Sequence, residues 1–296
     1  MVLQRLSAIG KTLRRGALVG GGIGAGLIAY AGGIERRWLD VTEHRVVMRD
    51  LPPEWDGVHV VQLTDLHLGI AGAPYAMLHD AVARTVAGRP DLIVLTGDYS
   101  QDGRPYPLDF LAPLAQTAPT IAILGNHDYL QRKIGADLIV KELERQEITV
   151  LRNDLTAFVH NGVAGVIVGF DDDARGPGAD VDGIVARMRG KGPSIALVHE
   201  PDVIDRFPDN WASLTLAGHT HGAQVRLSPV RTWDWVEWPI TEMQSDYPRG
   251  WFRVRGNWLY VSRGLGVTRW PIRFAARPEL ACFTLTRVED DGASPP

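Results

Sequence analysis

The sequence is poor in cysteine and in basic residues, and it contains no internal repeat. The single cysteine, Cys282, rules out a disulfide within the chain, and its apolar surroundings predict a buried packing role. The 31 lysines and arginines are outnumbered by 35 aspartates and glutamates. Because binding to nucleic acid relies on basic surfaces, this balance argues against nucleic acid as a partner. A hydrophobic fraction of 45% over 296 residues indicates a globular chain with one large core or two modest ones.

The amino-terminal end has no acidic residue before Glu35 and no charge between positions 16 and 34. These nineteen positions could cross a bilayer core of about 30 Å, although their eight glycines weaken a helix. Arg14-Arg15 before this run, with small residues at 29 and 31, indicates a twin-arginine-type export signal. We interpret residues 1–37 as such a signal or as an uncleaved membrane anchor. Either one places the body outside the cytoplasmic membrane, and the remaining alternative is a glycine-rich cytosolic tail.

The rest of the chain is expected to form one domain over residues 55–287, after a linker at 38–54 and before a disordered tail at 288–296. Apolar runs rich in Val, Ile and Leu alternate with segments of helical spacing, which is typical of a buried sheet covered by helices. The predicted fold class is α/β, with two mixed β-sheets packed face to face and helices outside. We expect strands at 58–64, 92–96, 120–124, 148–151, 157–160, 163–170, 194–198, 214–217, 223–227, 251–254, 258–262 and 281–286, and helices at 75–86, 108–115 and 134–145.

Polar side chains follow five of the expected strands, at the point where each strand ends. They are Asp65 and His67, then Asp98, then Asn126, His127 and Asp128, then His199, and finally His219 and His221. Because the carboxyl ends of strands line the ligand crevice in open α/β sheets, these side chains are expected to converge. Each motif alone is also typical of a turn or a helix cap, but five in order favour a common site.

Four histidines, two aspartates and one asparagine make a nitrogen and oxygen donor set without a thiolate. Such donors suit Mn, Fe, Zn or a similar divalent ion. Seven side chains exceed the needs of one tetrahedral ion and suit two ions that share a carboxylate, which is a recurring arrangement for phosphoryl chemistry. The sequence therefore predicts a site for two divalent metal ions.

The ordered motifs resemble the calcineurin-like metallophosphoesterase superfamily, whose pattern is D-x-H, GD, GNH(D/E), H and GH-x-H. The resemblance covers roughly residues 55–285, and no element of the pattern is missing. It implies a metallophosphoesterase-like αββα sandwich. A closer likeness is to a bacterial branch with a twin-arginine leader or an amino-terminal anchor, because Ser262–Gly266 and Pro271–Arg273 are similar to the ending of that branch. The branch includes cell-envelope phosphodiesterases and lipid A pathway pyrophosphatases.

This resemblance implies a role for each site residue. Asp65, His67 and His221 would hold the first ion, Asn126, His199 and His219 the second, and Asp98 would bridge them. His127 would face the substrate and stabilise charge on phosphorus or protonate the leaving oxygen, with Asp128 orienting its ring. A hydroxide generated at the two ions would attack the phosphorus atom.

The substrate implied by the branch and by the export signal is a phosphodiester or pyrophosphate of a cell-envelope lipid or glycan. Four of the nine tryptophans lie at 229–251, where they could form a lip that contacts lipid or could pack on the sheet edge. Four arginines are candidates for phosphate binding, namely Arg231, Arg249, Arg263 and Arg273. The alternatives are a phosphomonoesterase and a non-catalytic metal-binding scaffold on the same fold. The signature of metallo-β-lactamase-type hydrolases, H-x-H-x-D-H, is absent from the sequence.

Overall fold

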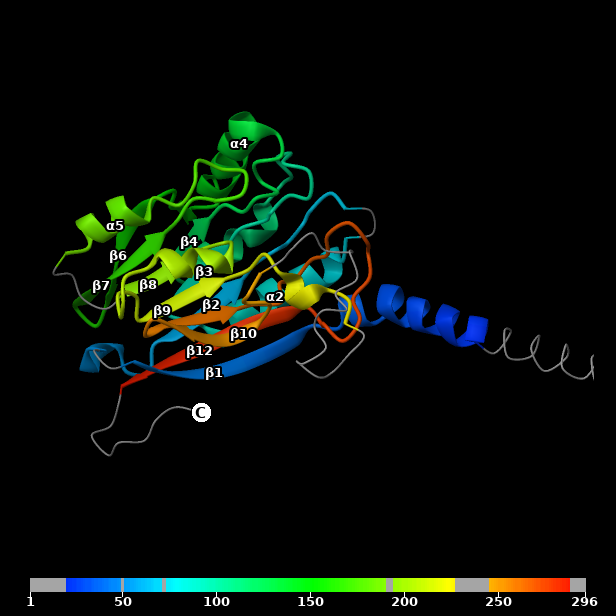
Figure 1. The fold of residues 1–296 in the computed structure, drawn as a ribbon, viewed down its shortest axis with the longest axis horizontal. Helices are drawn as coiled ribbons and strands as arrows, with labels where there is room; N and C mark the ends of the chain where they lie inside the picture. Colours follow the sequence, from blue (N-terminus) through cyan, green and yellow to red (C-terminus); the bar gives the residue numbers. More distant parts are fainter. Residues whose placement is uncertain (1–19, 49–50, 71–72, 190–193, 227–244, 288–296) are drawn as a thin grey trace, which may run out of the picture.

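The computed structural model describes residues 20–48, 51–70, 73–189, 194–226 and 245–287. Two six-stranded sheets face each other in the body of the molecule (Figure 1). The first sheet has the order β1-β12-β2-β3-β4-β5, with strands at Asp40–Met48, Glu279–Arg287, His59–Leu63, Leu92–Thr96, Thr120–Ile123 and Thr149–Val150. The second has the order β10-β11-β9-β8-β7-β6, with strands at Gly250–Val254, Asn257–Val261, Leu214–Ala217, Ser194–Leu197, Val163–Gly169 and Asp154–His160.

Both sheets are mixed. In the first, β2, β3, β4 and β5 run parallel, while β12 pairs antiparallel to β2 and parallel to β1. In the second, β7, β8, β9 and β11 run parallel, and β6 and β10 are antiparallel edges. The central strands are continuous apolar runs because both of their faces are covered. The predicted fold class, two mixed sheets with flanking helices, is confirmed.

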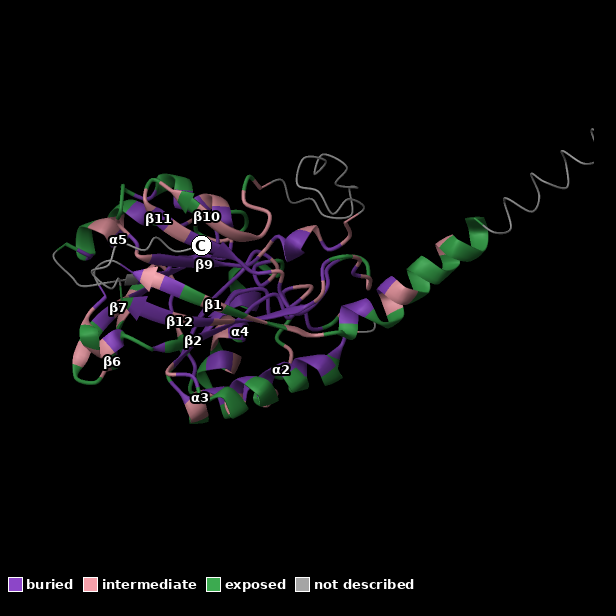
Figure 2. Ribbon diagram, turned by 90° about the horizontal axis from the view of Figure 1, so that it is seen from below, coloured by how far each residue is buried: buried purple, intermediate pink, exposed green. Residues whose placement is uncertain are grey.

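Three hydrophobic clusters hold the layers together. The middle cluster fills the space between the sheets and includes Val60, Ile123, Leu197, Leu216 and Phe283. A second cluster packs the helices α2 (Tyr75–Gly88), α3 (Ala112–Thr117) and α4 (Arg132–Glu144) on the first sheet, and a third packs α5 (Val181–Arg187) on the second. In Figure 2, α2 is buried on the side facing the sheet and exposed on the other, as an amphipathic helix requires. These layers form the αββα sandwich.

The expected linker at 38–54 was wrong for Asp40–Met48, which form β1. This strand pairs with β12, some 240 positions later in the chain, in a nine-residue parallel register. It is an edge strand whose first six residues alternate between exposed and half-buried, so its sequence lacks the apolar run of a central strand. Short 3₁₀ helices stand at Glu35–Arg37, Pro53–Trp55, Asp109–Leu111, Pro201–Arg206 and His221–Ala223.

The expected strand at 223–227 was also wrong, as far as the structure describes that segment. His221–Ala223 form a 3₁₀ helix, and Ala223 and Gln224 have φ angles of 65° and 42° that interrupt an extended backbone. Only an isolated bridge between Val225 and Phe274 remains of the expected pairing.

At the amino-terminal end, residues 20–33 form a helix that projects from the body (Figure 1). Its base is docked, since Ala31 is buried and its carbonyl accepts a hydrogen bond of 3.1 Å from the Arg273 N–H. In the described part of the chain, no helix has both the length and the apolar character that crossing a membrane requires. Arg14-Arg15 and the expected tail at 288–296 lie outside the described residues.

Candidate metal centre

The polar residues that follow the five strands meet where the carboxyl ends of the two sheets adjoin. The first sheet supplies Asp65 and His67 after β2, Asp98 after β3, and Asn126 and His127 after β4, and the second supplies His199 after β8 and His219 and His221 after β9. A continuous chain of close contacts links all seven residues predicted as metal ligands. Because each sheet supplies part of the donor set, the site lies where the two sheets meet.

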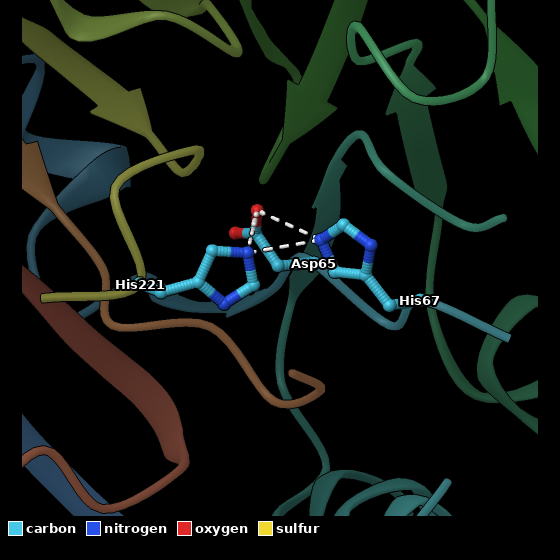
Figure 3. A group of neighbouring side chains, drawn as sticks. All are labelled: Asp65, His67 and His221. Atoms are coloured by element: carbon cyan, nitrogen blue, oxygen red, sulfur yellow. Dashed lines mark hydrogen bonds and ion pairs between the residues drawn. The ribbon is translucent and has the colours of Figure 1, made fainter. Parts of the chain in front are cut away.

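Asp65, His67 and His221 form one cluster, and Figure 3 shows their polar ends converging. The Nε2 atoms of His67 and His221 lie 2.9 Å apart. Asp65 Oδ1 lies 3.9 Å from Nε2 of His67 and 3.5 Å from Nε2 of His221. All three side chains are fully buried. Two imidazole nitrogens and a carboxylate oxygen at one point suit a borderline divalent ion.

Asp98 connects this cluster to a second set of donors. Its Oδ2 atom lies 3.3 Å from Nε2 of His67 and 3.3 Å from Nε2 of His199. On the far side, Asn126 Oδ1 lies 3.2 Å from His199 Nε2 and 3.0 Å from His219 Nδ1. The carboxylate of Asp98 thus lies between two donor sets.

The donor atoms fit metal ions better than they fit a hydrogen-bonded core. Asp98 Oδ2 and His67 Nδ1 are buried and accept or donate no hydrogen bond within the described residues. A buried polar atom without a partner is destabilising, and in native proteins it calls for an ion, a water or a functional reason. Groups of three donors, such as Asp65, Asp98 and His199, lie within 4.8 Å of one another. These clusters could hold divalent ions.

Burial keeps most of the imidazoles neutral. It lowers the pKa of His67 to about 3 and that of His219 to about 3, and it lowers the pKa of His221 well below its ordinary value. Burial likewise raises the pKa of Asp65 to about 6. A neutral imidazole has a free lone pair, which is the form that binds a metal.

His199 and Asp98 behave as a pair of opposite charges. Burial opposes a charge on either group, but their mutual attraction raises the pKa of His199 and lowers the pKa of Asp98 well below its usual range. His199 Nδ1 lies 2.7 Å from the carbonyl oxygen of Thr96, which can only accept, so Nδ1 carries a proton. This bond directs Nε2 toward Asp98, because a carbonyl that accepts from one ring nitrogen fixes the direction of the other, as is usual for histidines that bind metals.

His127 lies at the rim and is only half-buried, as is His219. Its Nδ1 donates to the carbonyl oxygen of Gln101 at 2.7 Å, and its backbone N–H donates to Asp98 Oδ1 at 2.8 Å. The ring is therefore held by a backbone carbonyl, leaving Nε2 as the free nitrogen.

The role expected for Asp128, orienting the ring of His127, was wrong. Its carboxylate is buried and accepts four backbone hydrogen bonds of 2.9–3.1 Å, from the N–H groups of Asp98, Tyr99, Ser100 and Gly125. Burial raises its pKa to about 8, while those donors act in the opposite direction. Asp128 thus ties the turn after β3 to the turn after β4.

The backbone of the site is in an unusual conformation. Five of the seven predicted ligands have left-handed φ angles between 47° and 73°, namely Asp65, His67, Asp98, His219 and His221. Gly97 has a φ of 94°, and a Cβ there would lie 2.6 Å from the backbone nitrogen of Gly125. A Cβ on Gly125 would lie 2.3 Å from Asp98 Oδ1. Backbone strain of this kind concentrates at functional sites.

Two of the arginines considered for phosphate binding have other roles. Arg273 is fully buried, and its guanidinium donates to the carbonyls of Arg263, Gly264, Gly266 and Ala276. Its Nη2 also lies 3.4 Å from His221 Nδ1, so it supports the loop beside that histidine. Arg263 pairs with Asp40 at 2.8 Å and with Glu279 at 3.2 Å.

The structure places Arg249, but it does not describe Arg231 or most of the tryptophan-rich segment. Arg249 lines a cavity of about 330 Å³ together with Arg263. Arg231 and the segment 229–238 lie outside the described residues. Trp251 packs in the sandwich, with its ring centroid 4.9 Å from that of Tyr260.

Sequence reasoning missed Asp172, a buried carboxylate near the site. It follows β7 and is close enough to His199 for their charges to interact, and burial raises its pKa. The signal was present, because Phe170 ends an apolar run that is followed by three aspartates. Gln101 was also missed, and it acts through its carbonyl, which no side-chain motif can reveal.

Comparisons with known proteins agree with this geometry. A family model described as calcineurin-like phosphoesterase matches residues 58–223. The chain is 33% identical over 294 residues to the uncharacterized metallophosphoesterase YkuE of Bacillus subtilis, covering 95% of this chain and 96% of that protein. It is 30% identical over 261 residues to the phosphodiesterase YaeI of Escherichia coli, covering 85% and 90%. It is 26% identical over 268 residues to a Danio rerio transmembrane protein with metallophosphoesterase domain, covering 84% and 57%.

Proposed function

The chain belongs to the calcineurin-like phosphoesterase family, and from this premise we propose that it is a two-metal hydrolase of phosphodiesters or pyrophosphates. Family membership and the Asp/His clusters support a metal-dependent phosphoesterase. The observation that carries the two-metal proposal is the position of Asp98. Its Oδ2 is 3.3 Å from a histidine of each donor set and makes no hydrogen bond to any residue that the structure describes.

In this proposal each of the two donor sets described above holds one metal ion. Asp65, His67 and His221 would hold one ion, Asn126, His199 and His219 would hold the other, and Asp98 would be shared. When bound, such ions supply Lewis-acid activation of the phosphate ester and of the attacking water. The protein contributes the fixed positions of the donors. The Thr96 carbonyl holds the ring of His199, and the Asp128 carboxylate holds the backbone of Asp98.

His127 is the residue placed to handle a proton. One ring nitrogen of His127 lies within 4.8 Å of the donor atoms of His67 and Asp98. Because Nδ1 is engaged by the Gln101 carbonyl, Nε2 is the nitrogen left to carry a proton to the leaving oxygen. Its partial exposure agrees with contact to a substrate.

We further propose that the substrate belongs to the cell envelope, as a phosphorylated lipid or glycan. The helix over residues 20–33 exposes Ile23, Leu27 and Ile28, with relative exposures of 60%, 48% and 67%. Exposed apolar residues on a projecting helix suit a lipid surface, and the basic positions before it suit the cytoplasmic leaflet. The name of one relative describes it as a transmembrane protein, and that of another as a phosphodiesterase. On this basis the body would act outside the cytoplasmic membrane, either exported or anchored.

The test of the reaction uses the full chain, because Ala31 and Glu35 are packed against the body. The protein is loaded with Mn²⁺ and offered a matched phosphomonoester, phosphodiester and pyrophosphate diester, with bound metal measured by mass spectrometry. Asp98→Asn is the test variant, and Asp209→Asn, at an exposed position, is its control.

Diester or pyrophosphate turnover that is lost only in Asp98→Asn supports the proposal. A preference for the monoester would make the protein a phosphomonoesterase. Absence of both turnover and bound metal would leave a scaffold on this fold as the better description.

The envelope proposal has its own test. Full-length protein is mixed with anionic lipid vesicles and floated on a density gradient, beside a variant in which Ile23, Leu27 and Ile28 are serine. Flotation that the triple change abolishes supports a lipid surface as partner, and equal behaviour of the two proteins contradicts it.

A further inference from the structure

We infer that a cavity beside the metal centre is an anion site that binds a second phosphate of the substrate, one that is not attacked. The inference rests on the proposed function and narrows it to substrates with a diphosphate group. The cavity has a volume of about 640 Å³ and lies between the start of α4, Arg152 and the loop after β7. That volume exceeds a single phosphate and suits a phosphate with its substituent.

The lining is strongly basic in an acidic protein. Four cationic side chains line the cavity, and Asp171 is the one acidic residue among the described lining residues. The whole chain carries a formal net charge of −4. A local excess of positive charge against that background attracts anions.

Three of these cations have no ion-pair partner in the part of the chain that the structure describes. The side chains of Arg132, Lys133 and Arg175 are exposed at the cavity. The fourth, Arg152, is neutralised by Asp137 at 2.8 Å and by Asp171 at 3.3 Å. Guanidinium and ammonium groups without protein partners are the groups that bind phosphate oxygens.

The cavity adjoins the reacting centre through the chain itself. Tyr129 lines it and stands two residues after His127, so their Cα atoms are at most about 7 Å apart. The backbone N–H of Arg132 donates to the carbonyl of Tyr129 at 2.7 Å. Arg132, the first residue of α4, therefore lies next to the turn that carries Tyr129. The turn after β4 thus carries both His127 and one wall of the cavity.

The opposite wall is rigid. Asp172, which is buried, accepts hydrogen bonds from the backbone N–H groups of Arg175 at 2.6 Å and Gly176 at 2.9 Å. The Tyr129 hydroxyl donates to Asp171, and a Cβ on Gly176 would lie 2.9 Å from that tyrosine ring. Because the loop is fixed before a ligand arrives, Arg175 loses little backbone freedom on binding an anion.

The test compares two substrates that differ by one phosphate, the nitrophenyl esters of uridine monophosphate and of uridine diphosphate. The holoenzyme and the triple variant Arg132→Gln, Lys133→Gln, Arg175→Gln are assayed with both, and products are separated by chromatography. Lys141→Gln, exposed on the same helix but outside the cavity, is the matched control. All three changed side chains are exposed at the cavity and none is a predicted metal ligand, so metal content should be unaltered.

Loss of about threefold in affinity per removed charge predicts a KM roughly 30-fold higher for the diphosphate ester in the triple variant. We expect the KM for the monophosphate ester to stay within about twofold, and the difference to shrink at high salt. An equal change for both esters, or no change for either, would overturn the inference.

A failure of the proposed function is distinguishable from a failure of the cavity. If neither ester is hydrolysed, binding of inorganic pyrophosphate to the wild-type and triple-variant proteins is measured by calorimetry. Weaker binding to the triple variant then supports the anion site, and equal binding refutes it.

Discussion

Asp128→Asn is the substitution that tests the structural role assigned to this carboxylate. Each carboxylate oxygen accepts two backbone N–H groups, and an asparagine can supply only one accepting oxygen. Its amide nitrogen would face the other two donors and leave them unsatisfied. A buried donor without a partner destabilises by about 1–3 kcal/mol, so the gross loss is about 2–6 kcal/mol.

The net loss should lie near the lower end of that range. A neutral amide is easier to bury than a carboxylate whose pKa is already raised by burial, which offsets part of the loss. We therefore expect the free energy of unfolding to fall by about 2 kcal/mol and Tm by about 4–8 °C, since about 2–4 °C per kcal/mol is usual for a domain of this size.

The assay is urea unfolding of the metal-free protein, so that ion binding does not contribute to the measured stability. Asp209→Asn serves as the control because its side chain is exposed. A loss of less than about 0.5 kcal/mol for Asp128→Asn, the size of an ordinary surface effect, would refute the assigned role. A stable variant that binds metal but has lost turnover would return Asp128 to the catalytic machinery.

Three further predictions concern other parts of the molecule. Arg273→Met should lower the free energy of unfolding by about 3 kcal/mol or more, because several buried carbonyls lose their hydrogen-bond donor. Urea unfolding measures this change, and an unchanged midpoint would contradict it. Gly125→Ala should reduce the bound metal measured by mass spectrometry, because its Cβ would lie 2.3 Å from Asp98 Oδ1, and full occupancy would refute it. His44 accepts the indole N–H of Trp251 at 3.3 Å, and burial lowers its pKa in the folded protein. Neutral His44 therefore contributes to the free energy of unfolding above about pH 6.5, the pKa of histidine in the unfolded chain. This contribution is lost as the pH falls through the lower pKa of the folded state. His44→Phe should flatten unfolding midpoints over this range, and parallel curves for the two proteins would be the contrary result.

The parts of the fold that the sequence predicts are those with a strong local pattern. The runs at β2, β3 and β4 are mostly apolar and almost wholly buried, and the buried positions of α2 recur at helical spacing. The helix α5 was missed because it has only seven residues, two of them buried, and depends on the Asp180 side chain to cap it. The local sequence pattern was therefore sufficient to predict the central strands and the long helix α2, and insufficient to predict the short helix α5.

The candidate site was predictable in composition but not in its supporting bonds. Each site residue follows an apolar run, and that order is visible in the chain. The partner of His127 is a backbone carbonyl, and three of the four N–H groups that Asp128 accepts lie some 30 positions earlier. Such contacts depend on how the turns after β3 and β4 approach in space, which periodicity does not encode.

The left-handed backbone at five of the predicted ligands limits which metal ions the centre could come to bind through substitution of its ligands. Aspartate, asparagine and histidine are the non-glycine residues that adopt this conformation most readily, and all five positions carry aspartate or histidine. Exchanges within that trio would adjust charge and donor type while the loops keep their path. Thiolate ligands, which would direct the centre toward softer metals, have no such conformational preference. Divergence toward a different metal chemistry would therefore require remaking the turns themselves and not only their side chains.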